Sequence, residues 1–285
     1  MKKVIIFGAS GTIGGALAKE LAVRGYEVYG TYLTRKPNHV PEERTKQLSL
    51  EHLEALQSFL EEVKPDYTVL SLHGEYADQM VFHERVADYL KANGGRMIFC
   101  STTNVYDACF DAPVTEQDPP AAATDYGQYK LACEQVMRTT LGDALTIVRI
   151  PAIYGISSPR IKGLLEKIQN REPIVIYNNL LRTINTDTML AKQIRWLMDE
   201  ERSGTFHLAT EDIVSDAVFT KRLIERWGFA DVSFQEEELS VPSPPPDNQL
   251  YFALRSQIEW PSEYVITHDQ VIEELGCAPL VTGQY

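Results

Sequence analysis

The sequence predicts an α/β fold, a doubly wound parallel sheet followed by a smaller C-terminal α/β substrate region. Three observations predict this class. Short runs rich in β-branched and apolar residues alternate with helix-like patterns through the first half of the chain, which is typical of parallel β-α-β units. The runs are largely apolar at successive positions, as expected of strands buried on both faces of a sheet. The first run leads directly into a glycine-rich stretch, GASGTIGG, that precedes a helical pattern.

The elements of the first half follow one another in strict alternation. Apolar and β-branched content predicts strands over residues 4–7, 27–31, 67–72, 96–100 and 145–150. Apolar residues at helical spacing predict helices over residues 12–23, 50–63, 80–90 and 126–139. We therefore predict a dinucleotide-binding domain over residues 1–150.

The alternation is looser after Pro151. Helices are predicted over residues 161–169, 187–198, 215–227 and 268–275, and strands over residues 174–176 and 205–208. The proline cluster SVPSPPPDNQ, at residues 240–249, predicts an extended surface segment. We expect residues 151–285 to form mainly the substrate region, with some segments returning to pack on the first domain.

Composition excludes several classes of function. The 285-residue chain has a formal net charge of −13, which argues against nucleic acid and membrane surfaces as partners, because both require a basic face. The four cysteines form no CxxC pair and no two histidines have zinc spacing, so no metal site is predicted. Isolated thiols fit a reducing compartment, and the opening apolar run is too short for a signal segment. We expect a cytoplasmic protein that binds a small-molecule substrate.

The glycines at the start predict a phosphate-binding turn. Gly8 ends the first strand, Gly11 allows the backbone to approach a pyrophosphate, and Gly14 allows the helix to pack closely on the strand. The helix N-terminus then offers free N–H groups and the positive end of its dipole to the phosphates. A plain strand-to-helix turn is the alternative reading. The predicted turn comprises Gly8, Ser10, Gly11, Thr12, Ile13 and Gly14, and it indicates a Rossmann-type sheet.

The end of the second strand favours NADP(H) over NAD. An acidic residue at this position would bind the ribose 2′-hydroxyl, whereas a nearby arginine accommodates a 2′-phosphate. In GYEVYGTYLTRKP, Tyr32 occupies the acidic position, and Arg35 and Lys36 follow. A solvated Arg-Lys pair is the alternative. We predict that Tyr32 and Arg35 contact NADP, with NAD as the second choice.

A tyrosine and a lysine form the candidate catalytic pair. Tyr126 and Lys130 in TDYGQYKLACEQ are four residues apart on a predicted helix, which places both on one helix face. A phenol is a poor base at neutral pH, but a nearby ammonium lowers its pKa. The pair could then exchange a proton with a carbonyl or alcohol oxygen. This spacing also occurs by chance, and its position after the glycine turn gives it weight.

The motifs together resemble the extended short-chain dehydrogenase/reductases. The stretches STTNVYD, YGQYKLACE and VRIPAIYG are similar to the family's SSxxVYG, Tyr-Gly-x-x-Lys-x-x-x-Glu and Arg-x-x-x-Val-Tyr-Gly patterns, and the likeness covers about residues 1 to 228. The resemblance implies that Thr102 is the catalytic hydroxyl, Tyr126 the general acid/base, and that Lys130 also holds the nicotinamide ribose. Further cofactor contacts are expected at Leu72, His73 and Pro151, although a histidine at such a position is more often an interior or pocket-edge residue.

The nearest subgroup is the dTDP-4-dehydrorhamnose reductase-like proteins, which EEVKPDYTVL and GYEVYGTY resemble. The resemblance implies NADP(H)-dependent reduction of a keto group, on a nucleotide-linked sugar. The chain departs from the subgroup at SLHGEY, where relatives read NAAA, and at Ala152, where relatives carry Asn or Trp. An NAD-dependent sugar-nucleotide epimerase and a non-catalytic NADP-binding regulatory subunit are the alternatives. A homodimer is left open.

The segment after the predicted catalytic threonine bears on dehydration. Sugar 4,6-dehydratases resemble this fold but carry an Asp-Glu pair at these two positions. Here the positions are Thr103 and Asn104, neither of which ionises usefully near neutral pH. We therefore predict that the protein has no dehydratase activity.

Overall fold

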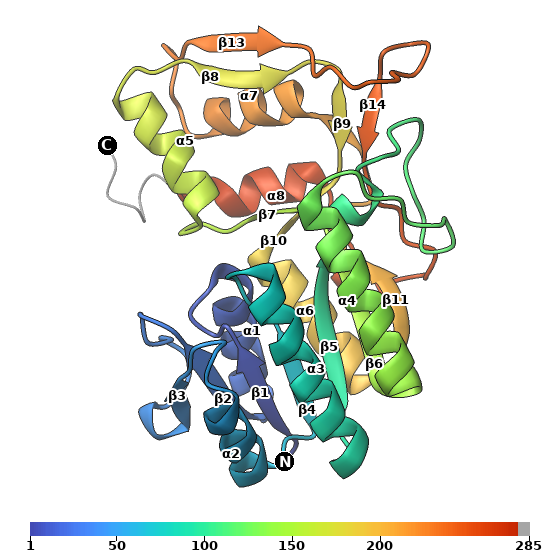
Figure 1. Ribbon diagram of the computed structural model, residues 1–285. Helices are drawn as coiled ribbons and strands as arrows, with labels where there is room; N and C mark the ends of the chain where they lie inside the picture. The colour runs from blue at the N-terminus through green and yellow to red at the C-terminus, as the bar shows by residue number, and fades with distance from the viewer. Residues whose placement is uncertain (279–285) are drawn as a thin grey trace. The chain divides into compact units, whose positions relative to one another are not determined.

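The computed structural model describes residues 1–278 and divides the chain into two compact units (Figure 1). The first unit comprises Met1–Val105, Asp125–Arg149 and Leu190–Phe206, and the second comprises Tyr106–Thr124, Ile150–Met189 and the chain from His207. The division at Arg149 lies next to the boundary expected at residue 150. The segment Tyr106–Thr124 differs from the expected ranges, since it belongs to the second unit.

A seven-stranded sheet forms the centre of the first unit. Its strand order is β11-β6-β5-β4-β1-β2-β3, in which β1 pairs with β2 and β4, β2 with β3, and β4 with β5, all in parallel. The order of the first six strands is that of a classic doubly wound dinucleotide fold. The strands are β1 (Lys3–Phe7), β2 (Glu27–Tyr32), β3 (Thr45–Gln47), β4 (Tyr67–Leu70), β5 (Arg96–Thr102), β6 (Leu145–Ile150) and β11 (Gly204–His207).

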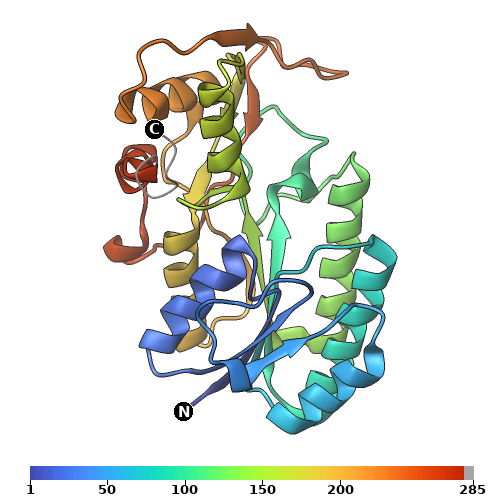
Figure 2. The same cartoon turned by 90° about the vertical axis from the view of Figure 1, so that its left-hand side faces the viewer.

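Helices cover both faces of this sheet (Figure 2). Apolar side chains of β1 and β4 pack with those of α2, α3 and α4 in one continuous core, which includes Phe7, Leu60, Phe82 and Met137. Burial on both faces explains why the strands read as apolar runs in the sequence. The helices are α1 (Thr12–Val23), α2 (Leu53–Val63), α3 (Tyr76–Asn93), α4 (Asp125–Leu141) and α6 (Asp187–Asp199).

In the first unit, the main differences from the predicted elements are at β3 and at the start of α3. The short edge strand β3 was not predicted, because its sequence, TKQ, is polar and only its pairing with β2 makes it a strand. Helix α3 begins at Tyr76 rather than at residue 80. Its first turn has no apolar periodicity and is held by the stacking of Tyr76 on Tyr129 of α4 and by a local hydrogen bond of 2.6 Å from Gln79 Nε2 to the carbonyl of Gly74.

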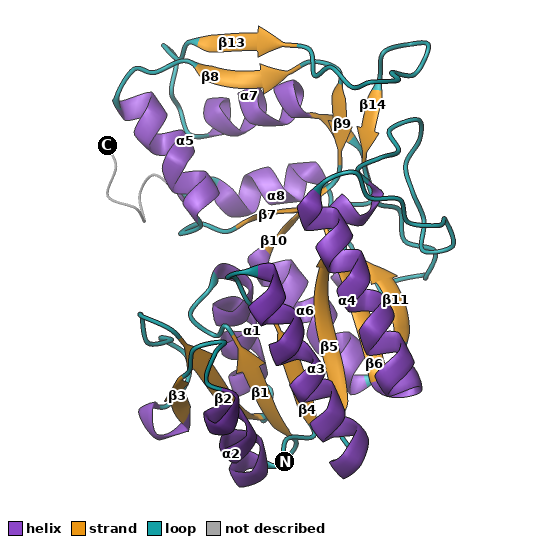
Figure 3. Ribbon diagram, viewed as in Figure 1, coloured by secondary structure: helices purple, strands orange, loops and turns teal. Residues whose placement is uncertain are grey.

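The second unit combines small sheets with three helices (Figure 3). The sheets are β10-β7, β12-β9-β14 and β13-β8, and the apolar core includes Tyr154, Ile161, Phe219 and Ile272. No helix within residues 1–278 combines the length and the apolar character that a membrane span requires. The elements are β7 (Ala152–Tyr154), α5 (Pro159–Gln169), β8 (Ile174–Tyr177), β9 (Leu180–Arg182), β10 (Ile184–Thr186), β12 (Val214–Ser215), α7 (Asp216–Arg226), β13 (Phe234–Glu237), β14 (Leu250–Phe252) and α8 (His268–Leu275).

Candidate active site

The glycine turn after β1 has no room for side chains. Gly8 has a φ of +89°, and a Cβ there would lie 2.2 Å from the carbonyl oxygen of Ser71. A Cβ on Gly14 would lie 2.3 Å from the carbonyl oxygen of Gly8, which shows that this glycine lets α1 pack directly on the turn. The N–H of Gly11 donates to the same carbonyl oxygen at 3.0 Å. The turn is therefore compact, with glycines at the two positions where backbone packs too closely for a side chain, as a dinucleotide-binding turn requires.

The N-terminus of helix α1 can bind an anion. Its N-cap residue, Gly11, provides no side-chain cap, and its first turn contains no acidic residue. The first N–H groups of a helix need an external acceptor, and the helix dipole favours a negative one. Thr12 and Ile13 lie in this first turn, where the sequence predicted phosphate contacts.

A cavity of about 320 Å³ opens beside the turn. It lies where β1, β2, β3 and β4 end, at the point of the sheet where ligands of doubly wound folds bind. Six predicted cofactor residues line it, namely Gly8, Ser10, Gly11, Tyr32, Leu72 and His73. The sequence predicted no cofactor contact for the others, which lie at or within a few residues of a strand end or in the first turn of the next helix: Thr31, Leu33, Leu48, Ser49, Leu50, Glu51, Ser71, Gly74 and Asp78.

Arg35 is the cation held against the glycine turn. Its Nη2 donates to the carbonyl of Ser10 at 2.8 Å, and the side chain is otherwise exposed. Lys36 instead pairs with Glu42 at 2.5 Å. Of the two basic residues that follow β2, Arg35 is therefore the one that an additional phosphate on the cofactor would meet.

The structure brings Thr102 and Tyr126 together. Thr102 ends β5 and is buried, and its hydroxyl donates to Asn104 Oδ1 at 3.0 Å. Tyr126 lies in the first turn of α4, is partly exposed, and shares a hydrogen bond with Thr102. Two hydroxyl groups from separate elements thus meet at one point, an arrangement that can hold a substrate oxygen between them.

Lys130 lies one turn further along α4 and is buried. Its ammonium donates to the carbonyl of Cys100 at 3.0 Å and lies 4.8 Å from the centre of the Phe99 ring. Burial lowers the pKa of Lys130, while Cys100, Cys133 and Glu134 act in the opposite direction.

The pKa of Tyr126 shifts opposite to the sequence-based prediction. We predicted that Lys130 would lower it. In the structure the pKa of Tyr126 is raised above its usual value, first because the phenol is withdrawn from water, against a lowering effect of the bond with Thr102. Removal from water disfavours the phenolate. Tyr126 is therefore protonated at neutral pH.

A buried ion pair joins the elements that carry Thr102, Tyr126 and Lys130. Glu134, on α4, accepts hydrogen bonds from Arg149 of β6 at 3.0 and 2.7 Å and from the hydroxyl of Ser101 of β5 at 2.5 Å. The carboxylate and the guanidinium are both almost fully buried. This network joins β5, β6 and α4, and so fixes Tyr126 and Lys130 relative to Thr102.

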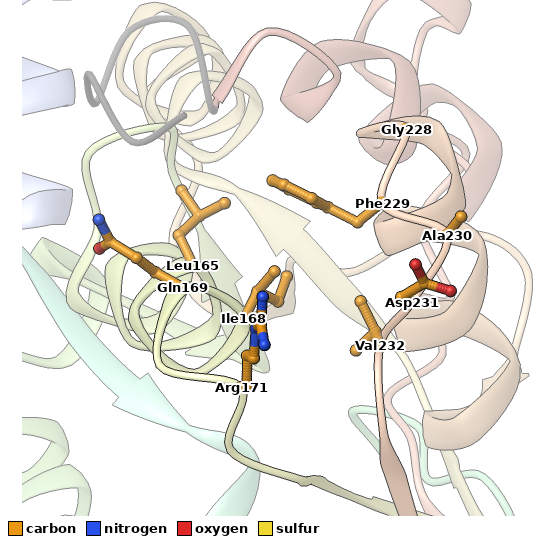
Figure 4. Close-up of a pocket in the computed structure, with 9 residues that line it drawn as sticks. All are labelled: Leu165, Ile168, Gln169, Arg171, Gly228, Phe229, Ala230, Asp231 and Val232. Carbon is orange, nitrogen blue, oxygen red and sulfur yellow. The ribbon is translucent and has the colours of Figure 1, made fainter.

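The remaining predicted contact and a second cavity lie in the other unit. Pro151 directly follows β6 and is buried there, so its predicted contact with a cofactor stays a prediction. A cavity of about 320 Å³ lies between the end of α5 and the loop after α7 (Figure 4). Its lining includes Leu165, Phe229, Arg171 and Asp231 but none of the predicted site residues. Within residues 1–278, no three His, Cys, Asp or Glu side chains converge as a metal site would need.

Comparison with known proteins places this geometry in context. The family model described as the RmlD substrate binding domain matches residues 1–249. The spore coat polysaccharide biosynthesis protein SpsK of Bacillus subtilis is 24% identical over 98% of this chain and 93% of that protein. The methionine adenosyltransferase 2 subunit beta of Danio rerio is 24% identical over 74% of this chain and 69% of that protein.

A solved structure shares the fold. The crystal structure of a dTDP-4-dehydrorhamnose reductase from Bacillus anthracis, in complex with NADP, matches with a TM-score of 0.77. The sequences are 19% identical, and the match covers 99% of this chain and 100% of that one. The predicted doubly wound fold is thereby confirmed.

Proposed function

We propose that this chain, which belongs to the RmlD substrate binding domain family, is an NADP(H)-dependent oxidoreductase that reduces a keto group of a nucleotide-linked sugar. The observation that carries the proposal is the pairing of Thr102 and Tyr126 in the unit that also contains the glycine turn and its cavity. A protein that only bound the cofactor would need the turn but not the hydroxyl pair.

The residues divide the chemistry among them. The chemistry that NADPH would supply when bound is a hydride for the carbonyl carbon. Tyr126, which is protonated at neutral pH, donates its phenolic proton to the carbonyl oxygen. Thr102 orients the same oxygen by a hydrogen bond. Lys130 holds the nicotinamide ribose with the N–H groups that its bond to Cys100 leaves available.

Cofactor choice follows from Arg35. Its guanidinium lies at the glycine turn, where it would pair with a 2′-phosphate, and this supports NADP(H) over NAD. The nucleotide-linked sugar as substrate, the cytoplasm as location and a homodimer as assembly belong to the same proposal. The reductase name of a structural relative supports the first of these.

The proposal is tested by following NADPH oxidation with a panel of nucleotide-linked 4-keto sugars, beginning with dTDP-4-dehydrorhamnose. We expect net oxidation of NADPH that depends on the presence of a keto sugar. Interconversion of two sugar nucleotides without net cofactor turnover would indicate the epimerase instead. Oxidation by wild type but not by Tyr126→Phe would assign the activity to this site.

A regulatory subunit is the second candidate, and one observation favours it. The chain resembles the beta subunit of methionine adenosyltransferase 2 over 74% of its length. Tight NADP binding with no turnover on any keto sugar, together with altered kinetics of a methionine adenosyltransferase on mixing, would support this candidate and remove the reductase.

A further inference from the structure

Tyr76 has an unusual position for an aromatic residue. It is the first residue of α3 and retains 41% exposure, whereas large hydrophobic side chains of the first unit are mostly buried. It ends the SLHGEY segment, which is where the sequence departs from the pattern of its relatives. No motif in the sequence predicts a role for it.

The ring of Tyr76 is held flat beside the catalytic phenol. It stacks on the buried ring of Tyr129, with centroids 4.5 Å apart and planes 5° apart. Its centroid lies 6.2 Å from that of Tyr126, at an interplanar angle of 39°. Tyr129 covers one face of the ring, while the residue as a whole keeps 41% exposure.

The neighbours of Tyr76 along the chain reach the cofactor cavity. Gly74 and Asp78, two residues before and two after it, both line that cavity. The bond from Gln79 to the carbonyl of Gly74 holds this turn in place. Tyr76 therefore lies close along the chain to two residues of the cavity wall, and its ring lies beside that of Tyr126.

We propose that Tyr76 is a specificity-determining residue whose exposed ring surface packs against the apolar C–H face of the substrate's pyranose ring. The inference rests on the proposed function and names the part of the substrate that this residue recognises. An aromatic ring has a negative face, which attracts the positively polarised hydrogens of a sugar C–H face. Stacking on Tyr129 already fixes the ring, so little side-chain entropy is lost on binding.

The test separates the sugar from the nucleotide. Calorimetry on the NADP⁺-loaded protein gives the affinities for dTDP-rhamnose and for dTDP, and their ratio is the contribution of the sugar. Wild type should bind dTDP-rhamnose more tightly. Tyr76→Ala should reduce the ratio by about tenfold, the factor expected from roughly 50 Å² of lost apolar burial, with dTDP affinity unchanged.

Two variants isolate the ring itself. Tyr76→Phe keeps the flat ring and should keep the ratio, whereas Tyr76→Leu keeps apolar bulk without a ring face and should lose most of it. Val81→Ala, at another exposed apolar position of α3, is the matched control and should change nothing. If Tyr76→Ala does not fold, Tyr76→Leu takes its place. An unchanged NADP⁺ affinity and an unchanged thermal unfolding temperature show that Tyr76→Leu is folded.

Three results would overturn the inference: an unchanged ratio in Tyr76→Leu, a lost ratio in Tyr76→Phe, or equal affinity of wild type for dTDP-rhamnose and dTDP. Failure of the proposed function would appear in a different measurement: wild type would oxidise no NADPH with any keto sugar. Because the affinity ratio is measured without turnover, it decides the role of Tyr76 in either case.

Discussion

The carboxylate of Glu134 accepts two hydrogen bonds from the guanidinium of Arg149, one to each oxygen, at 3.0 and 2.7 Å. Both side chains are buried, one on the helix that carries Tyr126 and the other on the strand next to the one that ends at Thr102. Glu134 belongs to the motif YGQYKLACE and Arg149 to the motif VRIPAIYG, but the sequence does not show that the two residues are in contact. Their contact holds α4 in a fixed position against the sheet.

Removing one partner of this pair should lower the free energy of unfolding. Arg149→Met leaves an uncompensated buried carboxylate, and such losses cost about 3–5 kcal/mol of unfolding free energy. Arg138→Met is the matched control, because Arg138 approaches the same carboxylate only at 3.9 Å and is 47% exposed. Its loss should be below about 1 kcal/mol. Urea denaturation measures both, and equal losses would contradict a structural role for the buried pair.

Tyr126→Phe should reduce kcat by about 10²–10⁴-fold, the usual contribution of a general acid. Only the phenolic oxygen is lost, so the affinity for NADPH should remain. Thr102→Val should have a smaller effect, since it removes one orienting bond of roughly 0.5–1.5 kcal/mol. Steady-state kinetics on an active keto sugar, with calorimetry for the cofactor, gives the order. Near-full turnover by Tyr126→Phe would exclude it as the acid.

Arg35→Ala should weaken NADPH about tenfold to a hundredfold, because a charge-assisted hydrogen bond contributes roughly 1.5–3 kcal/mol. The affinity for NADH should change little, since NADH lacks the 2′-phosphate. Lys36→Ala is the control, because Lys36 is engaged by Glu42. Calorimetric titration with both cofactors checks the prediction, which fails if Arg35→Ala weakens the two equally.

Asp187 makes stability depend on pH. Burial raises the pKa of its carboxyl to about 6. Between its unfolded pKa and about 6 the folded state holds more protons than the unfolded state, so stability falls as pH rises through this range. The loss is complete above it and amounts to roughly 2–3 kcal/mol.

Asp187→Asn should therefore be more stable than wild type at pH 7.5 and have no such advantage at pH 4.5. The amide oxygen can still accept the bond of 2.9 Å from the N–H of Thr188. Urea denaturation at the two pH values measures the difference. Asp231→Asn, at an exposed position, is the control. A difference from wild type that did not change with pH would contradict the assignment.

The protein should not dehydrate nucleotide hexoses. Thr103 and Asn104 occupy the positions after Thr102 where dehydration would need an acid and a base, and the Asn104 amide is bonded to the Thr102 hydroxyl at 3.0 Å. Incubation of dTDP-glucose with NAD, analysed by mass spectrometry, should give no 4-keto-6-deoxy product. Formation of that product would mean that other groups supply the acid and the base.

The sequence by itself determined the alternation of strands and helices, the glycine turn, and the placement of Tyr126 and Lys130 on one helix. Each of these depends on neighbours within a few residues, through apolar periodicity and the steric demands of glycine. Six of the cofactor residues predicted from sequence also line the cavity, because they lie where strands end.

Only the tertiary structure decided the rest. Strand β3 and the first turn of α3 form through partners outside their own segments, and the ring of Tyr76 meets Tyr126 across 50 positions of sequence. The tertiary structure also decided the direction in which the pKa of Tyr126 shifts. Spacing on a helix shows which charge is near, but how much water the fold removes from the phenol depends on segments far away in the chain, and here that removal is the larger effect.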